Sequence, residues 1–216
     1  MIENKKILIT GGAGFIGTVL CKMFYKNNQI TLFDNLSRNS IKNTSLLRNS
    51  EVKLIEADIL DREAVEEAVS DVDIVIHAAG IAGIDTVIKK PVDTMSVNLI
   101  GTYNVLEACI HNPNIERVVD FSTSEIFGSR AYLVKEEESS IIGKVGEARW
   151  VYAVSKLAAE HFAHSYFLQH GLPVTTVRPF NIYGPGQVGE GAINTFIKKA
   201  ISDEDIVIHG DGNQIR

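Results

Sequence analysis

A glycine-rich turn after a short apolar run places the strongest constraint on the fold of this chain. The run KILIT at 6–10 is typical of a buried strand, and the turn GGAGFIG follows it at 11–17. Gly11 allows a tight exit from a strand, Gly14 lets backbone approach a pyrophosphate, and Gly17 lets a helix pack closely. The first amides of such a helix attract anions. The sequence therefore predicts a strand, a phosphate-binding turn and a helix, in that order.

Short apolar runs alternate with longer helical segments along the rest of the chain. This alternation predicts an α/β fold, a doubly wound parallel sheet of Rossmann type with about seven strands and helices on both faces. The expected strands cover 6–10, 29–34, 52–57, 73–77, 117–122, 174–178 and 205–209. The expected helices cover 15–28, 62–70, 91–111, 150–170 and 192–201.

Two segments differ from this regular pattern. The stretch at 128–147 is the longest without a helix or strand signal, and loops of that length are often functional. The expected helix at 150–170 is apolar on several faces, although a helix on a sheet needs only one apolar stripe. The surplus face indicates either a subunit contact or burial under further chain. Its apolar residues are Val151, Val154, Leu157, Ala158, Phe162, Tyr166 and Phe167.

Charge and composition limit the partners that this chain can have. Its net charge of −6, from 21 basic and 27 acidic residues, argues against nucleic acid or an anionic membrane. No apolar run approaches bilayer length. Cys21 and Cys109 lie among apolar neighbours, which predicts core packing, and no metal-ligand spacing is present. The N-terminus leads directly into a strand without a signal peptide, so a cytoplasmic location is expected.

An acidic residue at the end of the second expected strand indicates which dinucleotide binds. Asp34 lies about 20 residues after the glycine turn, where a carboxylate can hold a ribose 2′-hydroxyl. A carboxylate there repels a 2′-phosphate, which favours NAD over NADP, although Arg38 lies nearby in the sequence. Asp58 fits two roles, a contact to the adenine amino group or a helix N-cap. His77, before small residues that leave room for a cofactor, is expected to be structural.

A tyrosine and a lysine four residues apart suggest acid–base chemistry. A free phenol has a pKa near ~10, and Lys156 lies one helical turn from Tyr152 on the same face. The charge of the lysine, together with that of an oxidised nicotinamide, is expected to lower the phenol pKa. The phenolate then accepts a hydroxyl proton as hydride leaves the neighbouring carbon.

The fifth expected strand ends in hydroxyl groups and an acid, in the sequence STSE at 122–125. Strand ends of this kind face the ligand crevice, so a hydroxyl there can share the substrate hydrogen bond with Tyr152. Glu125 fits two roles. It can shuttle a second proton in a partly dry site, or it can be a surface acid paired with Arg149.

These motifs together resemble those of the extended short-chain dehydrogenase/reductases, specifically the NAD-dependent nucleotide-sugar epimerases, dehydratases and decarboxylases. The matching motifs lie at 10–17, 58–59, 77–79, 98, 122–125, 152–156 and 178–185. The resemblance implies a tightly held NAD, a nucleotide-diphosphate sugar as substrate, and a homodimer formed by helices at about 92–111 and 150–170. It implies catalysis by Tyr152, Lys156, Thr123 and Glu125, and substrate contacts from Ser124, Asn181 and Arg216. The implied NAD-binding residues are Gly11, Gly14, Phe15, Ile16, Gly17, Asp34, Asn35, Asp58, Ile59, Ala78, Ala79, Asn98, Lys156 and Pro179.

Within this family all members first oxidise the C4 hydroxyl of the sugar, and the later steps differ. Thr123, Ser124 and Glu125 resemble the decarboxylases and some dehydratases, and the sequence RWVY at 149–152 resembles the UDP-glucuronate decarboxylases. Phe127 departs from the tyrosine that is usual before Gly128. The alternative to an enzyme is an NAD-binding sensor or assembly module without turnover.

The resemblance also bears on domain organisation. Residues 210–216 resemble the motif that leads into the substrate-binding C-terminal region of this family, and the sequence stops there. We therefore expect one NAD-binding domain over 1–216 that includes only the start of a substrate-binding region, at about 180–216. Roughly a third of a usual member is then absent.

Overall fold

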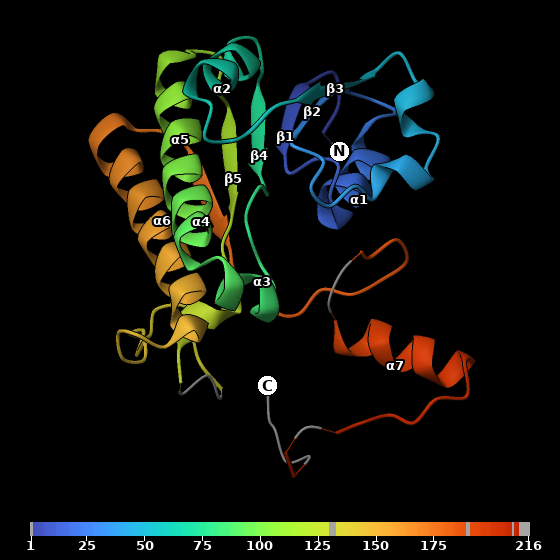
Figure 1. The fold of residues 1–216 in the computed structure, drawn as a ribbon. Coiled ribbons are helices and arrows are strands. Elements are labelled where there is room, and N and C mark those ends of the chain that lie inside the picture. Colours follow the sequence, from blue (N-terminus) through green and yellow to red (C-terminus); the bar gives the residue numbers. More distant parts are fainter. Residues whose placement is uncertain (1, 130–132, 189–190, 209, 212–216) are drawn as a thin grey trace.

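The computed structural model describes residues 2–129, 133–188, 191–208 and 210–211, and it contains a six-stranded parallel sheet (Figure 1). The strand order is β3-β2-β1-β4-β5-β6, so the direction of winding reverses between β1 and β4. In sheets of this kind ligands bind beyond the carboxyl ends of the strands at that reversal. The strands are β1 (Lys6–Thr10), β2 (Gln29–Asp34), β3 (Val52–Glu56), β4 (Ile74–His77), β5 (Arg117–Phe121) and β6 (Val174–Val177).

Helices cover both faces of the sheet, because alternate residues of each strand point to opposite faces. Leu8, Val75 and Val118 face one core, which they share with three helices, α2, α5 and α6. Ile7 and Ile9 face the other core, which contains Cys21 from α1. The helices are α1 (Phe15–Phe24), α2 (Arg62–Val69), α3 (Ile84–Lys89), α4 (Pro91–Met95), α5 (Gly101–His111), α6 (Ala148–His170) and α7 (Ala192–Ile201).

The predicted doubly wound fold is confirmed, and two helices differ from their predicted form. The first helix ends at Phe24 rather than at 28. The Asn28 side chain stops it, because its NH₂ group donates to the Phe24 carbonyl oxygen (2.9 Å) and its oxygen accepts from the backbone amide of Lys5 (3.0 Å). The helix predicted at 91–111 is interrupted by a π-helical turn, η3 (Ser96–Ile100), between α4 and α5. Such turns occur most often at functional sites.

The prediction of a seventh strand at 205–209 is wrong for the part that the structure describes. Residues 205–208 pair with no strand, and Ile206, Val207 and Ile208 are 46%, 57% and 67% exposed. A strand needs a hydrogen-bonding neighbour. This segment follows α7, which buries no residue and lies apart from the sheet in Figure 1. His209 lies outside the described residues.

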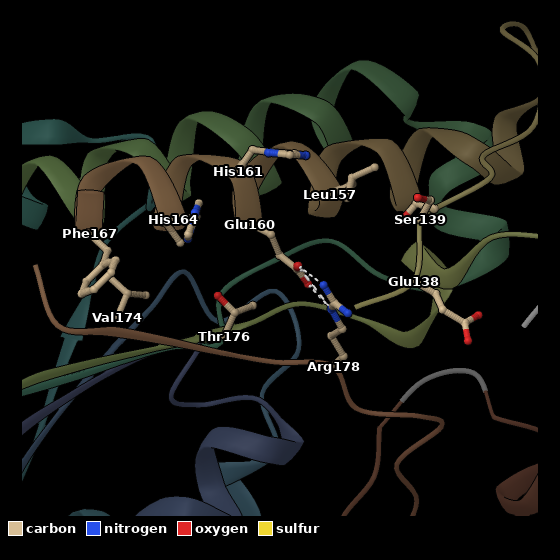
Figure 2. Close-up of a pocket in the computed structure, with 12 residues that line it drawn as sticks. Glu138, Ser139, Leu157, Glu160, His161, His164, Phe167, Val174, Thr176 and Arg178 are labelled. Carbon is tan, nitrogen blue, oxygen red and sulfur yellow. Dashed lines mark hydrogen bonds and ion pairs between the residues drawn. The ribbon is translucent and has the colours of Figure 1, made fainter. Parts of the chain in front are cut away.

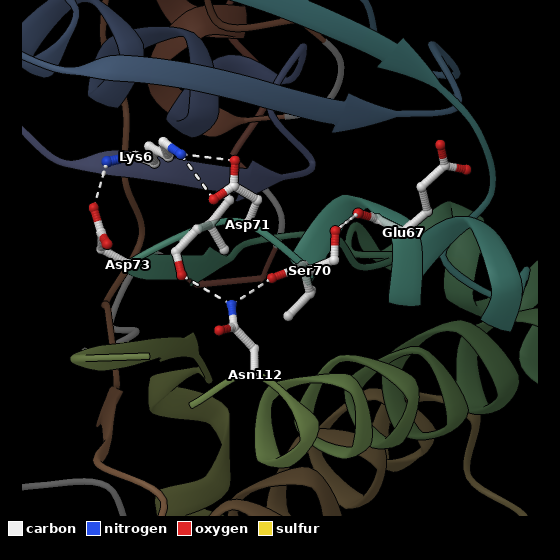
Figure 3. A network of polar contacts seen from close by, with 8 residues as sticks. Lys6, Glu67, Ser70, Asp71, Asp73 and Asn112 are labelled. Atoms are coloured by element: carbon white, nitrogen blue, oxygen red, sulfur yellow. Dashed lines mark hydrogen bonds and ion pairs between the residues drawn. The ribbon is translucent and has the colours of Figure 1, made fainter. Parts of the chain in front are cut away.

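Polar contacts close the amino-terminal edge of the sheet, opposite the crevice (Figure 3). Lys6 at the start of β1 donates its amide to Asp73 (2.8 Å), and its ammonium pairs with Asp71 (2.7 Å). Asn112, just after α5, donates to the carbonyl oxygens of Val69 (2.7 Å) and Val72 (3.0 Å). These bonds tie the ends of α2 and α5 to the sheet at a distance from the candidate site.

We predict that Asn112→Ala lowers the free energy of unfolding by about 2 kcal/mol, because two buried carbonyl groups lose their donor. Urea denaturation followed by circular dichroism measures this change. Asn27→Ala is the matched control, since its amide donates only to the exposed Glu3 carboxylate, and a change within about 0.5 kcal/mol is expected there. Equal losses in both variants would contradict the role assigned to Asn112.

Candidate functional site

The glycine turn between β1 and α1 is tight enough to exclude side chains. Gly11 has a φ of 66°, and its amide donates to the Phe33 carbonyl oxygen (2.8 Å). A Cβ atom on Gly17 would lie 2.5 Å from the Gly11 oxygen, so the helix packs directly on the turn. A Cβ on Gly14 would meet only that same oxygen, at 3.1 Å. The roles predicted for Gly11 and Gly17 are therefore confirmed, and Gly14 leaves its other side open to a ligand.

Asp34 lies beside this turn at the end of β2. Its carboxylate accepts hydrogen bonds from the amides of Ala13 (3.0 Å) and Leu36 (2.7 Å). Burial raises the pKa of Asp34, and backbone hydrogen bonds from Leu36, Ala13 and Gly14 oppose that rise. A carboxylate offers about four acceptor positions, so these backbone bonds leave capacity for ribose hydroxyls. The open turn, the start of α1 and this acid together fit a dinucleotide.

A row of polar side chains, three of them buried and one half-buried, crosses the sheet at the carboxyl ends of four strands. Thr10, His77, Asp120 and Thr176 occupy one register on β1, β4, β5 and β6. Because each of the first three is two residues beyond Leu8, Val75 or Val118, they face α5 and α6. Thr10, His77 and Asp120 are each 1% exposed. The core beneath α6 therefore ends in polar and ionisable groups.

His77 connects the glycine turn to α5 through hydrogen bonds whose donors can be assigned. Thr102 donates its hydroxyl to the Asn98 carbonyl oxygen (2.7 Å), so it accepts from His77 Nε2 (3.0 Å). His77 Nδ1 is then the acceptor for the Thr10 hydroxyl (2.7 Å), which itself accepts from the Ala79 amide (3.3 Å). Burial, together with the charge of Lys156, lowers the pKa of His77 to about 3. His77 is thus a neutral structural residue, as its sequence context predicted.

Asn98 lies in the π-helical turn and reaches the helix that carries the tyrosine. Its side chain, 0% exposed, accepts from the Ile81 amide (2.8 Å) and donates to the Ser155 hydroxyl (3.0 Å). Ser155 in turn donates to the Tyr152 carbonyl oxygen (2.8 Å). The structure therefore places Asn98 as a support of α6, and the predicted contact of Asn98 with NAD stays a prediction.

Tyr152 and Thr123 meet at the carboxyl end of β5. Burial raises the pKa of Tyr152, the nearby Thr123 side chain opposes that rise, and the charge of Glu125 adds to it. In the protein alone the phenol pKa is therefore not lowered, because burial outweighs the contribution of Thr123. The predicted lowering by Lys156 together with an oxidised nicotinamide stays a prediction for the NAD complex. Glu125 is half-buried, and the side chain of its alternative partner Arg149 lies outside the described residues.

Lys156 is buried beneath the same strand end. It is 4% exposed, and its ammonium donates to the Phe121 carbonyl oxygen (2.6 Å). Burial lowers the pKa of Lys156, while Asp120 and Glu160 raise it. A Cβ built on Gly80 would lie 3.6 Å from the lysine nitrogen, so only an exposed glycine separates the ammonium from the crevice.

The remaining predicted residues that the structure describes follow the carboxyl ends of the strands. Asn35 donates to the exposed Asp58 carboxylate (3.3 Å), but Asp61 and not Asp58 caps α2, so the N-cap alternative is wrong. The Ile59 side chain is buried in the core against Gly101. The Ser124 amide donates to the Pro179 carbonyl oxygen (3.0 Å). Phe15 and Ile16 begin α1, Ala78 and Ala79 follow β4, Asn181 is exposed, and Arg216 lies outside the described residues.

A groove of ≈ 830 Å³ runs along α6 and β6, and its lining includes none of the predicted catalytic or cofactor residues (Figure 2). Arg178 and Glu160 form an ion pair in it (2.9 Å), and the Arg178 guanidinium stands 5.2 Å from the centre of the Phe127 ring. Among the described residues, no helix is long and apolar enough to cross a membrane. The same part of the chain contains no cluster of metal-ligand side chains.

Sequence reasoning missed four residues of this site. Thr10, Thr102 and Ser155 carry the hydrogen bonds described above, and Asp120 lies beneath Lys156. Two of these residues have a signal in the sequence. Ser155 lies between Tyr152 and Lys156, and Asp120 is an acid within the apolar strand at 117–121. The contact between Thr102 and His77 joins residues 25 apart and has no local signal.

A doubly wound parallel sheet with a glycine turn at a helix start, and a Tyr-x-x-x-Lys pair beside a threonine, defines the short-chain dehydrogenase/reductase class. Residues 7–216 match the profile of the NAD dependent epimerase/dehydratase family. The chain belongs to this family, whose cofactor is NAD, so the predicted family and cofactor are confirmed.

Relatives in this family carry out different reactions. The chain is 37% identical to a UDP-N-acetyl-alpha-D-glucosaminuronate decarboxylase of Bacillus cytotoxicus, over 99% of this chain and 66% of that protein. It is 33% identical to a dTDP-D-glucose 4,6-dehydratase of Dictyostelium discoideum, over 98% of this chain and 52% of that protein. UDP-glucuronic acid 4-epimerase from Bacillus cereus, solved with UDP-glucuronic acid and NAD, superposes with a TM-score of 0.85 at 32% identity, over 97% and 67% of the two chains. The chain thus spans about two thirds or less of its first two relatives.

We predict different outcomes for alanine at two glycines of the turn. Gly17→Ala should destabilise the fold by about 2 kcal/mol or more, because its Cβ overlaps backbone that cannot move. Gly14→Ala, with a φ of −70°, should keep the fold but weaken NAD binding at least about tenfold. Thermal denaturation and calorimetric titration with NAD measure the two effects. Unchanged affinity in Gly14→Ala would place the pyrophosphate elsewhere.

Proposed function

We propose that this chain is the NAD-binding and catalytic part of a nucleotide-sugar enzyme that works through a transient 4-keto sugar. The observation that carries the proposal is that Thr123 and the Tyr152–Lys156 pair meet at the carboxyl end of β5, on the same edge of the sheet as the glycine turn; there the Lys156 ammonium donates to the Phe121 carbonyl oxygen (2.6 Å). NAD bound there would accept a hydride from the sugar carbon and return it later. An NAD-binding sensor needs the glycine turn but neither Tyr152 nor Lys156, so the intact pair supports an enzyme.

NAD would be held by residues that the structure brings to one edge of the sheet. The start of α1, with Phe15 and Ile16, would face the pyrophosphate, and Asp34 would accept from the adenosine ribose. Asn35, Asp58 and Ile59 lie where the adenine would reach the ends of β2 and β3. Toward the nicotinamide the proposed contacts come from Ala78, Ala79, Asn98, Lys156 and Pro179.

Tyr152 would be the base that takes the proton from the C4 hydroxyl. Its pKa is raised by burial in the protein alone, so the phenol is protonated at neutral pH. A positive nicotinamide ring beside it favours the charged phenolate and opposes that rise. Deprotonation would then depend on bound NAD, which links the base to the presence of the oxidant.

We favour decarboxylation of a UDP-hexuronate as the second step. A ketone at C4 lies β to the C6 carboxylate, so the C5–C6 electron pair can move toward the C4 oxygen as carbon dioxide leaves. Glu125 lies close enough to Tyr152 to raise its pKa. It would supply the proton that C5 takes up once carbon dioxide has left. Two of the relatives named above act on or bind UDP-uronates, which supports this substrate class. Ser124, Asn181 and Arg216 would contact the substrate.

Dehydration and epimerisation are the competing second steps, since both begin with the same oxidation. The Dictyostelium relative is named as a dehydratase and the Bacillus cereus structure as an epimerase. An acid at position 125 serves dehydration as well as decarboxylation, so the products decide between them.

We predict that the enzyme containing this chain converts UDP-glucuronate or UDP-N-acetylglucosaminuronate with release of carbon dioxide. Incubation with these two sugars, and with UDP-glucose and dTDP-glucose as well, followed by mass spectrometry and NMR, identifies the product.

Tyr152→Phe should bind NAD normally and lose activity at least about 100-fold, because only the proton acceptor is removed. Lack of turnover on the whole panel would contradict the proposal, as would an active Tyr152→Phe variant.

The chain is also proposed to form a homodimer in the cytoplasm. In Figure 1 α6 runs beside α4 and α5. Three aliphatic side chains on α6 and on the segment from α4 to α5 are exposed, namely Val92 (74%), Ile100 (49%) and Val154 (39%). Exposed aliphatic side chains on neighbouring helices favour contact with a second copy.

We predict that light scattering gives twice the mass of one chain, and that Val154→Asp gives a monomer with unchanged circular dichroism. Val207→Asp is the control, because Val207 is 57% exposed but lies outside these helices. A monomeric parent protein would contradict the dimer.

A further inference from the structure

Asp120 is a buried acid that the proposed reaction does not use. It lies on β5 between His77 of β4 and Thr176 of β6, and it is 1% exposed. Neither carboxylate oxygen has a hydrogen-bond partner among the described residues. A buried carboxylate without partners is costly, so a compensating positive charge is expected nearby.

The groups that face Asp120 leave one candidate for that charge. His77, its neighbour across the strand pair, is neutral, because both ring nitrogens are committed to threonine hydroxyls. Thr176 carries no charge. On α6 the facing groups are Lys156 and Glu160, and Glu160 is engaged by Arg178 through both carboxylate oxygens (3.0 and 2.9 Å). Lys156 is therefore the cation available to Asp120.

Lys156 needs a nearby anion, because a buried ammonium without a counter-charge is also costly. It is 4% exposed, and its ammonium donates to the carbonyl oxygen of Phe121, the residue after Asp120. A carbonyl group supplies a hydrogen bond but no charge. No direct ion pair joins the two side chains among the described residues. Asp120 therefore acts on Lys156 through its charge, and since both side chains are buried, screening by water is weak.

We propose that Asp120 is a positioning residue whose carboxylate keeps Lys156 protonated at the nicotinamide side of the crevice. The inference rests on the proposed function, in which Lys156 contacts the nicotinamide end of the bound NAD. Burial lowers the pKa of Lys156, and Asp120 is the largest cause that raises it. Without Asp120 the lysine would lose its proton at a lower pH than in the wild-type protein.

The test is the pKa of Lys156, measured by NMR in protein labelled with ¹³C at the lysine ε-carbons, without NAD. The Lys156 signal is assigned from its absence in Lys156→Met. In Asp120→Asn, which keeps the shape of the side chain, the Lys156 pKa should fall by about one unit or more. Because a lysine is charged below its pKa, the variant loses the ammonium at lower pH. Asp71→Asn removes an exposed acid paired with Lys6 and should leave the Lys156 pKa unchanged.

A second measurement covers the case in which Asp120→Asn does not fold. In Lys156→Met the buried carboxylate has no counter-charge, so the folded-state pKa of Asp120 rises further above its unfolded value. Such a group stabilises the fold at low pH and loses that stabilisation as the pH rises through the folded-state pKa. Melting temperatures of Lys156→Met should therefore fall relative to wild type with increasing pH.

Each result bears on one claim. An unchanged Lys156 pKa in Asp120→Asn, or a pH-independent difference between Lys156→Met and wild type, would overturn the role of Asp120. Calorimetric titration of the wild-type protein with NAD tests the proposed function separately. Failure to bind NAD contradicts that function and leaves the charge coupling between Asp120 and Lys156 to be decided by the pKa measurement.

Discussion

One continuous set of hydrogen bonds joins the two halves of the candidate site. It runs from Thr10, beside the glycine turn, through His77 and Thr102 to Asn98, and from there through Ser155 to the backbone of Tyr152. Each buried donor meets an acceptor, and this requirement fixes the tautomer of the histidine. Since buried polar groups are costly when unpaired, the set tolerates only one arrangement of β1, β4, α5 and α6. The glycine turn and α6 therefore keep a fixed separation.

The same burial that fixes this geometry determines the electrostatics of the site. It raises the pKa of Tyr152 and of Asp120, and it lowers the pKa of Lys156 and of His77. All four shifts favour the neutral form of the group, which is the expected effect of removing water. A charged base or a charged lysine must then be stabilised by a specific partner. For Lys156 that partner is Asp120 in our account, and for Tyr152 it is the oxidised nicotinamide.

The sequence was sufficient to predict the fold class, the order of the elements and the edge at which the site lies. These follow from local signals: apolar runs of strand length, glycines at a strand–helix turn, and an acid after the second strand. The errors have a common cause. The π-helical turn at 96–100, the true N-cap Asp61 and the absence of a strand at 205–208 all depend on tertiary neighbours. The direction of the Tyr152 pKa shift likewise depends on its burial, which residue spacing does not report.

We propose that the glycine turn and the tyrosine helix form one dinucleotide site, and a crystal structure of this chain with NAD would test this. The pyrophosphate is expected at the start of α1, with the nicotinamide ring beside Tyr152 and its ribose within hydrogen-bond distance of the Lys156 ammonium. A dinucleotide bound in the groove between α6 and β6, or a nicotinamide ring turned away from Tyr152, would contradict it.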